Sequence, residues 1–172
     1  GGENLRIQAT AALLATGEAR RVPIPSEATH VSRFTVPFLF GLGLVDAIDT
    51  LTLLAMADPE DVDGDGISGR LGRDGDGRPA RFGRKADTAT LRAFSEGASR
   101  LEMGLTTPEH PDEAAAGAIP SVPAGTDPAP EPELDIRTLD AVTDFVRFLA
   151  PPEQAVPLDA ADSTQVARGR GL

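Results

Sequence analysis

The chain has 172 residues, a formal net charge of -11 and no cysteine, tryptophan or tyrosine. This length fits one domain or a part of a larger one. The negative charge argues against nucleic acid as a partner, because an acidic surface repels phosphates. Without cysteine the chain forms no disulfide, no thiolate metal site and no covalent haem attachment. No apolar run in the sequence is long enough to span a membrane.

The N-terminal part is predicted to begin with an amphipathic helix over residues 1–17, where Asn4 can cap the start and Gly17 can end the helix. Residues 18–33 are irregular and rich in arginine and proline. His30 lies there without a second histidine or a carboxylate cluster beside it. We therefore interpret His30 as an ordinary loop residue rather than a ligand or a switch.

Residues 34–48, FTVPFLFGLGLVDAI, form the most apolar stretch. Pro37 and two glycines argue against a regular helix, and glycine lets backbones pack closely. We expect a buried extended segment with a tight turn. Its phenylalanines are expected to supply much of the core, although they could also line a cofactor pocket: Phe34, Phe38 and Phe40.

A short helix is predicted over residues 49–57, with Asp49 as its cap and Pro59 as its stop. An acidic loop follows at once, with carboxylates at alternate positions and glycines between them: Asp61, Asp63 and Asp65. This alternation is typical of a loop that binds a hard cation such as calcium.

Counting from Asp61 as position 1 of an EF-hand-type loop, Gly66 falls at position 6 and the Ile67 carbonyl at position 7. Position 12 is Gly72, so the bidentate glutamate of an EF-hand is absent. Other oxygens must complete the coordination, and the candidates are Asp58, Asp74 and Asp76. The alternative is a solvated acidic turn, but we favour a calcium site.

Basic residues are dense over residues 70–85 and alternate with acidic ones. We expect them to neutralise the acidic loop and one another. A sharper alternative is that one or two of them contact an anion such as a haem propionate.

The C-terminal half is predicted to hold helices over residues 87–103 and 135–150, capped by Asp87 and Asp135. Gly104 fits the position just past the first of them. Met103 could offer its thioether to an iron centre, although core packing is the better explanation for this residue taken alone. Residues 105–133 are rich in proline, alanine and glycine, with His110 expected in solvent. A last helix starts near Asp162 and runs to the end.

These elements predict a mainly α fold, with long irregular loops and a calcium-type acidic loop. Three regions are expected: a helical segment over 1–104 with the FLFGLGL stretch and the metal loop, a linker over 105–133 rich in proline, alanine and glycine, and a helical segment over 134–172. No general acid–base pair, nucleophile triad or phosphate loop is visible.

Six blocks, in this order, resemble the di-haem oxidoreductases, extracytoplasmic c-type cytochromes related to bacterial di-haem peroxidases. The blocks are FLFGLGLVDAI, LLAMADPEDVDGDGISGR, RFGRKA, TLRAFSEGASRLEMGLTTP, LDAVTDFVRFLAPP and QVARGRGL. The resemblance implies cytochrome-c-like helices, a periplasmic or extracellular location, and an acidic loop that binds calcium near the haems. It also implies electron transfer or peroxide chemistry, and it makes Met103 in the EMG block the best candidate for a residue near haem.

The chain departs from this family at informative positions. Family members attach haem through Cys-x-x-Cys-His motifs, and this sequence contains none. Arg84 stands in RFGRKA where relatives commonly carry tryptophan. Aromatic relay residues of the tryptophan and tyrosine type are also absent. Any haem c would therefore not be attached to these residues.

Two functions are compatible with these observations. We favour a haem-free, calcium-binding accessory subunit that derives from a di-haem oxidoreductase and docks on an extracytoplasmic electron-transfer assembly, respiratory or photosynthetic. The alternative is a piece of an active di-haem peroxidase or oxidoreductase whose haem-binding parts lie outside these residues. A calcium-dependent adhesion or scaffolding module is a weaker third possibility.

Overall fold

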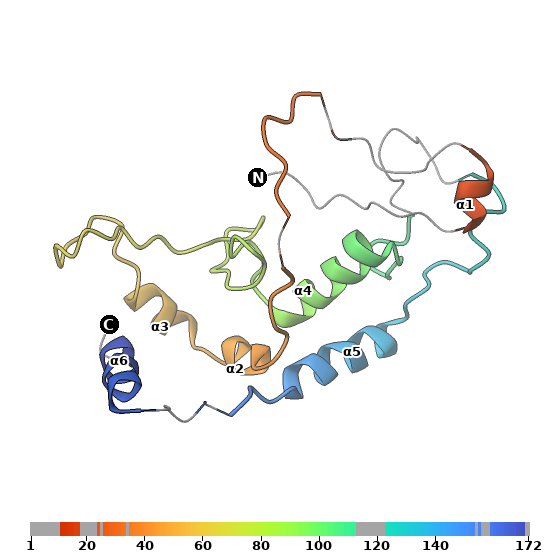
Figure 1. The fold of residues 1–172 in the computed structure, drawn as a ribbon. Coiled ribbons are helices and arrows are strands. Elements are labelled where there is room, and N and C mark those ends of the chain that lie inside the picture. Colours follow the sequence, from red (N-terminus) through yellow and green to blue (C-terminus); the bar gives the residue numbers. More distant parts are fainter. Residues whose placement is uncertain are drawn as a thin grey trace.

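Helices joined by long irregular segments make up the chain in the computed structural model (Figure 1). The structure describes residues 11–17, 24, 26–33, 35–112, 123–153, 155 and 159–170, apart from the side chain of Leu13. Over these residues extended backbone pairs only at isolated positions and forms no strand: Asp58 with Gly69, Arg73 with Pro79, Phe82 with Thr88, and Thr107 with His110. The predicted mainly α fold class is confirmed.

Two capped helices form the centre of the structure, α4 (Leu91–Ala98) and α5 (Ile136–Phe148). Asp135 accepts a hydrogen bond from the Thr138 N–H at 2.7 Å, so the predicted cap of α5 is confirmed. The cap of α4 is Thr90, whose hydroxyl accepts from the Ala93 N–H at 3.2 Å. The prediction that Asp87 caps this helix is wrong, because Phe82 and Thr88 pair and hold Asp87 in the turn between them.

The apolar stretch around Gly41 forms a short helix, α2 (Leu42–Asp46), so the prediction of a wholly extended segment is wrong. Gly41 adopts a left-handed φ of 77° just before α2, a conformation that glycine accepts without strain. Gly43 lies against α5, where a β-carbon on it would overlap the carbonyl oxygen of Arg147. Gly41 thus allows the chain to turn sharply into α2, and Gly43 allows α2 to lie close to α5. Neither glycine prevents the helix.

The core lies where α2, α4 and α5 meet, and it is small. Leu91 and Leu139 are fully buried, and the rings of Phe82 and Phe94 stack with centroids 5.9 Å apart. Val146 of α5 completes the cluster with Phe82 and Leu91. Arg81 anchors this region by donating to the carbonyl oxygens at the end of α2, those of Val45, Asp46 and Ile48.

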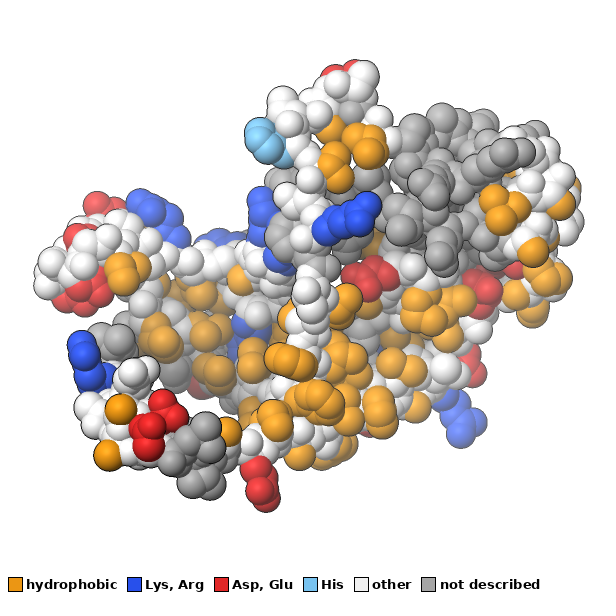
Figure 2. Space-filling model, in the orientation of Figure 1, with side chains coloured by type: hydrophobic (Ala, Val, Ile, Leu, Met, Phe, Trp, Pro, Cys, Tyr) orange, Lys and Arg blue, Asp and Glu red, His pale blue; other side chains and the backbone are white. Residues whose placement is uncertain are grey.

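Many large apolar side chains beside this core are exposed. Phe38 and Phe40 are 81% and 52% exposed, so the expectation that they fill the core is wrong, and Phe34 lies outside the described residues. We use the name apolar face for the exposed apolar side chains of α5, of α2 and of the segment before α2: Phe38, Phe40, Leu44, Val142, Phe145 and Phe148. Hydrophobic side chains gather over this part of the molecule in Figure 2.

The remaining helices lie around this centre (Figure 1). α3 (Thr50–Ala55) is capped by Asp49, which accepts from the Leu51 N–H at 2.7 Å, as predicted. α1 (Ala11–Ala15) is the described part of the helix predicted over 1–17. α6 (Ala160–Arg170) begins two residues before the predicted start at Asp162 and has no buried residue. No described helix is long and apolar enough to cross a membrane.

α4 continues into a π-helical turn, η1 (Ser99–Met103), which ends at Gly104 with a φ of 80°. A π-helical turn holds more residues than an α-helical turn, so it rotates the residues that follow. Leu101 is 44% exposed and Met103 is 70% exposed. Both side chains are therefore at least partly exposed to solvent.

The beginning and the end of the predicted linker are hydrogen-bonded to each other. Thr106 and Thr107 are almost completely buried. The Thr106 N–H donates to Glu133 at 3.1 Å, and the Leu134 N–H donates to the Thr106 carbonyl at 3.1 Å. Residues 113–122 lie outside the described part, and the division into three regions remains a prediction.

The close contact between α2 and α5 generates a stability prediction. Gly43→Ala should lower the free energy of unfolding by about 2 kcal/mol, because the new methyl group forces the two helices apart. Gly97→Ala is the matched control, since a β-carbon there meets nothing within 4 Å and α4 should gain up to about 1 kcal/mol. Chemical denaturation measures both, and equal effects would contradict the proposed contact.

Candidate functional site

The acidic loop between α3 and residue 70 is closed at its base by the backbone. The Asp58 N–H donates to the Gly69 carbonyl at 2.9 Å. Within the loop Asp61, Gly64 and Gly66 adopt positive φ values of 52°, 72° and 86°. Glycine takes this conformation easily and aspartate is one of the few other residues that tolerates it. The residue types of the loop therefore allow the chain to turn sharply around its own centre.

Three carboxylates converge inside this loop: Asp58, Asp61 and Asp63. Each offers one oxygen, and the three oxygens lie within 4.8 Å of one another. Asp58 and Asp61 are partly buried and Asp63 is exposed. Like charges at such distances repel, and a divalent cation between them would turn the repulsion into attraction.

Backbone donors hold these carboxylates in place. The Val62 N–H donates to the Asp58 carboxylate at 2.9 Å, and the Gly66 N–H donates to Asp61 at 3.1 Å. The Asp65 N–H donates to Asp63 at 3.2 Å. Each such bond occupies only part of a carboxylate's acceptor capacity, so oxygen lone pairs stay available for a metal ion.

Asp65, Asp74 and Asp76, which the sequence also proposed as ligands, lie outside this group. Asp65 accepts from the Ile67 N–H at 2.7 Å, and the Ile67 carbonyl remains a predicted ligand. Asp74 forms an ion pair with Arg78 at 2.7 Å. Desolvation acts to raise the pKa of Asp74, but the hydrogen bonds from Arg78 and from the Asp76 N–H outweigh it and lower that pKa. Asp74 is therefore engaged with Arg78 in a second turn.

The described arginines of residues 70–85 mostly serve the local structure. Arg78 pairs with Asp74 and with Asp76, the latter at 3.1 Å. Arg70 donates to the Pro59 carbonyl at 3.3 Å and so reaches the acidic loop, and Arg73 donates to the Gly77 carbonyl at 2.7 Å. Arg78 pairs with carboxylates of its own turn, whereas Arg70 and Arg73 donate to backbone carbonyls. Neutralisation of the acidic loop by the basic residues therefore remains a prediction, as does the anion-binding alternative.

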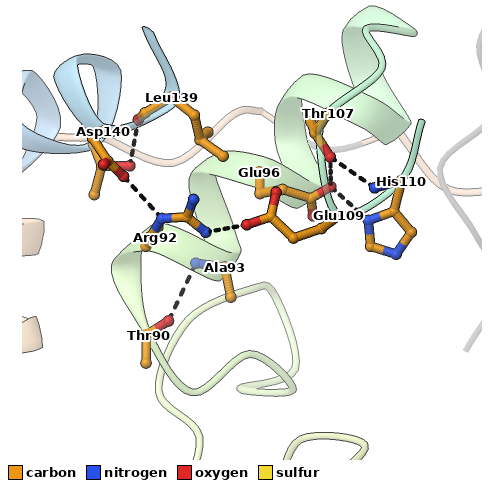
Figure 3. Close-up of polar contacts among 10 residues, drawn as sticks. Thr90, Arg92, Ala93, Glu96, Thr107, Glu109, His110, Leu139 and Asp140 are labelled. Carbon is orange, nitrogen blue, oxygen red and sulfur yellow. Dashed lines mark hydrogen bonds and ion pairs between the residues drawn. The ribbon is translucent and has the colours of Figure 1, made fainter. Parts of the chain in front are cut away.

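A second polar group connects α4, α5 and the turn that follows η1 (Figure 3). Arg92 of α4 donates to Glu109 at 2.8 Å and to Asp140 of α5 at 2.9 Å. These hydrogen bonds, to Asp140 first and then to Glu109, raise the pKa of Arg92. The hydrogen bond from Arg92 in turn lowers the pKa of Glu109. Arg92 thus acts as a clamp between three segments.

Beside this clamp, His110 donates from Nδ1 to Oε1 of Glu96 at 2.8 Å, and the Thr107 hydroxyl donates to the same oxygen at 2.9 Å. Glu96 is almost fully buried and the His110 side chain is about half exposed, at 49%. His110 is exposed, as expected, and the structure also gives its ring a hydrogen-bond partner. The sequence signal was the TTPEH turn after η1, which brings a histidine next to α4.

Residues 26–169 match the model of the family described as di-haem oxidoreductase, putative peroxidase. The match spans most of the 172 residues, so the chain belongs to the di-haem oxidoreductase family. No curated protein and no solved structure matches the sequence.

The side chains of this protein could coordinate the iron of a haem, but they cannot attach a haem covalently. With no cysteine it has no sulfur for thioether bonds to a porphyrin. It does present side chains that can coordinate iron, because the Met103 thioether is 70% exposed and the His110 imidazole is half exposed. These residues could supply an axial ligand to a haem that is attached elsewhere.

The carboxylate group predicts cation binding that depends on Asp63. Asp63→Asn should weaken calcium binding about ten-fold or more, because one of three negative charges is lost while an oxygen acceptor for the Asp65 N–H remains. Isothermal titration calorimetry with CaCl2 measures this. Glu60→Gln is the control, because it removes one negative charge from an exposed residue of the same loop that lies outside the group of three carboxylates. The calcium affinity of this variant should stay near that of the parent chain. Equal losses in both variants would contradict a site at these carboxylates.

The Arg92 clamp predicts a pH dependence. The pKa of Glu109 is lower in the folded chain, so its ion pair stabilises the fold above the ordinary pKa and this contribution is lost as the pH falls through the folded value. Arg92→Met should raise the pKa of Glu109, seen by NMR titration, and lower stability at neutral pH by about 1 kcal/mol. In Arg137→Met, on an exposed position of α5, the Glu109 titration should not move.

Proposed function

We propose that this chain is a calcium-binding structural element of an extracytoplasmic electron-transfer assembly of the di-haem oxidoreductase type. In this proposal the haems of the assembly are attached elsewhere than to these residues. The chain supplies a helical support and a metal-stabilised loop. It docks through its apolar face on the haem-carrying part, which belongs to a respiratory or photosynthetic complex.

The apolar face is the observation that carries the proposal. Phe148 and Phe38 are each 81% exposed and Phe145 is 66% exposed, next to a core with very few fully buried apolar residues. Contiguous exposed apolar side chains of this kind mark surfaces that another protein or a ligand covers. Aromatic rings on two adjacent elements are suited to packing against a protein surface or the edge of a porphyrin.

The proposal that the haems are attached elsewhere follows from the absence of cysteine in these residues. Haem c is bound through thioether bonds to cysteine, and these 172 residues contain none. The family is described as di-haem, so an assembly with this chain needs haem from another source. When bound, haem supplies the electron-transfer chemistry, and the residues of this chain orient and cover it.

Calcium is the favoured ion for the acidic loop because its donors are carboxylate oxygens on a flexible backbone. Zinc would favour nitrogen or sulfur ligands. An extracytoplasmic location supports the same choice, since such compartments supply calcium at the concentrations that weak sites require.

A second candidate is a di-haem peroxidase or oxidoreductase whose haem-binding segments belong to the same polypeptide as these residues. The family match favours it, since the described family is enzymatic. In that case the apolar face is an internal contact of one protein. The two candidates differ in which polypeptide bears the covalent haem.

The experiment is to isolate the native complex with an affinity tag on this chain and stain the separated polypeptides for covalent haem after denaturation. We expect haem on a partner polypeptide and none on the polypeptide that contains this chain. Calcium chelation should lower the melting temperature of this chain, because an ion that binds only the folded state stabilises it. Covalent haem on the tagged polypeptide would establish the second candidate, and an unchanged melting curve would remove the calcium part.

A further inference from the structure

The motif Asp-Gly-Asp-Gly occurs twice in the chain, once in the acidic loop and once in the turn that follows it. The first copy is residues 63–66 and is followed by Ile67, whereas the second copy is residues 74–77 and is followed by Arg78. An isolated pair of extended residues closes each copy: Asp58 with Gly69, and Arg73 with Pro79. The same residue types are thus used twice, and only the second copy has a positive side chain directly after it.

The backbone of the two copies is similar. The Asp65 N–H donates to the Asp63 carboxylate at 3.2 Å, and the Asp76 N–H donates to the Asp74 carboxylate at 3.0 Å. The last glycine has a positive φ in both copies, 86° in the first and 80° in the second. The two copies therefore share the local structure that holds the first aspartate in place.

The two copies differ in how their negative charge is compensated. In the second copy the Arg78 guanidinium contacts both carboxylates, with Nε 2.7 Å from Asp74 Oδ2 and Nη2 3.1 Å from Asp76 Oδ2. The Arg78 N–H also donates to Asp74 at 2.9 Å and so holds the residue that carries the guanidinium. The second copy thus already has a bound cation, and this cation belongs to the chain itself.

The first copy has no such internal cation. Ile67 occupies the position that Arg78 has in the second copy, and its uncharged side chain is 69% exposed. Over the described residues no arginine, lysine or histidine forms an ion pair with any of the three converging carboxylates. Arg70, which follows this loop, donates to a backbone carbonyl at 3.3 Å. A cation for the first copy must therefore come from the solvent.

We propose that the residue directly after each Asp-Gly-Asp-Gly motif decides where the cation of that copy comes from. Arg78 supplies it from the chain and so excludes a metal ion, because a guanidinium and a divalent cation repel each other and compete for the same carboxylate oxygens. Ile67 supplies none, so the acidic loop stays open and the chain binds a single calcium ion. For the first copy the proposal rests on the calcium site of the proposed function, and it adds the residue that keeps this site open.

The first half of the test places an arginine after the first motif. Ile67→Arg should lower the calcium affinity about ten-fold or more, because its guanidinium takes the place of the ion. Val62→Arg is the matched control, since it adds the same charge to the same loop at an 86% exposed position that does not follow the motif. Its affinity should fall only about two-fold, by the screened repulsion of a surface charge. Equal losses in the two variants would contradict the role of position 67.

The second half of the test removes the internal cation. Equilibrium dialysis with radioactive calcium should show that Arg78→Ile binds one ion more than the parent chain, with a dissociation constant on the order of 1 mM. Arg78→Gln should give the same gain, so the result does not depend on an apolar replacement. Asp74→Asn in the Arg78→Ile background should remove the additional ion. Circular dichroism shows whether each variant is folded.

The outcome for the second copy is independent of the acidic loop, because the gain is measured relative to the parent chain. No additional ion in folded Arg78→Ile and Arg78→Gln would overturn the proposal, and so would an additional ion that persists after Asp74→Asn. A second calcium ion in the parent chain would overturn it too. A parent chain that binds no calcium removes the calcium part of the proposed function, and the proposal then stands or falls on the gain in the second copy.

Discussion

The contact of α2 with α5 at Gly43 is the constraint on which the rest of the structure depends. Because Gly43 has no side chain, α2 lies directly against the Arg147 backbone, and Asp46 at its end comes within reach of two groups. Asp46 accepts from the Leu91 N–H at 3.0 Å and pairs with Arg147 at 3.6 Å. One short helix thereby fixes the start of α4 against α5. It also presents carbonyl oxygens to Arg81, which attaches the arginine-rich turns that follow the acidic loop.

The sequence was sufficient for the elements whose signals are local. Asp135 and Asp49 were recognisable as caps because the residue type and its position before an apolar pattern decide the capping bond. The glycines around position 42 predict a break in a helix, although their effect depends on Arg147 and Pro151, which lie far along the chain. The exposure of Phe38 could not be predicted either, because the sequence pattern of an exposed apolar residue resembles that of one in a core.

In the candidate sites, too, local features could be predicted from the sequence and contacts between distant residues could not. The alternating aspartates identified the acidic loop, and Asp58 was a candidate from the sequence because it lies just before them. EF-hand spacing alone would have chosen Asp65, whose carboxylate lies outside the group of three that converge in the loop. The pairs of Arg92 with Asp140 and of Glu96 with His110 join residues that are distant in sequence. Only the packing of α4 brings them together, so no local pattern could reveal them.

The π-helical turn η1 affects which side chains this surface offers. Such a turn holds one residue more than an α-helical turn. The buried face of α4 lies before it, since Leu91, Ser95 and Glu96 precede it. The segment after η1, with the turn that carries His110, is rotated relative to a regular continuation of α4. One residue more in a helical turn thus changes which side chains the protein offers to its surroundings, while the core residues of α4 keep their places.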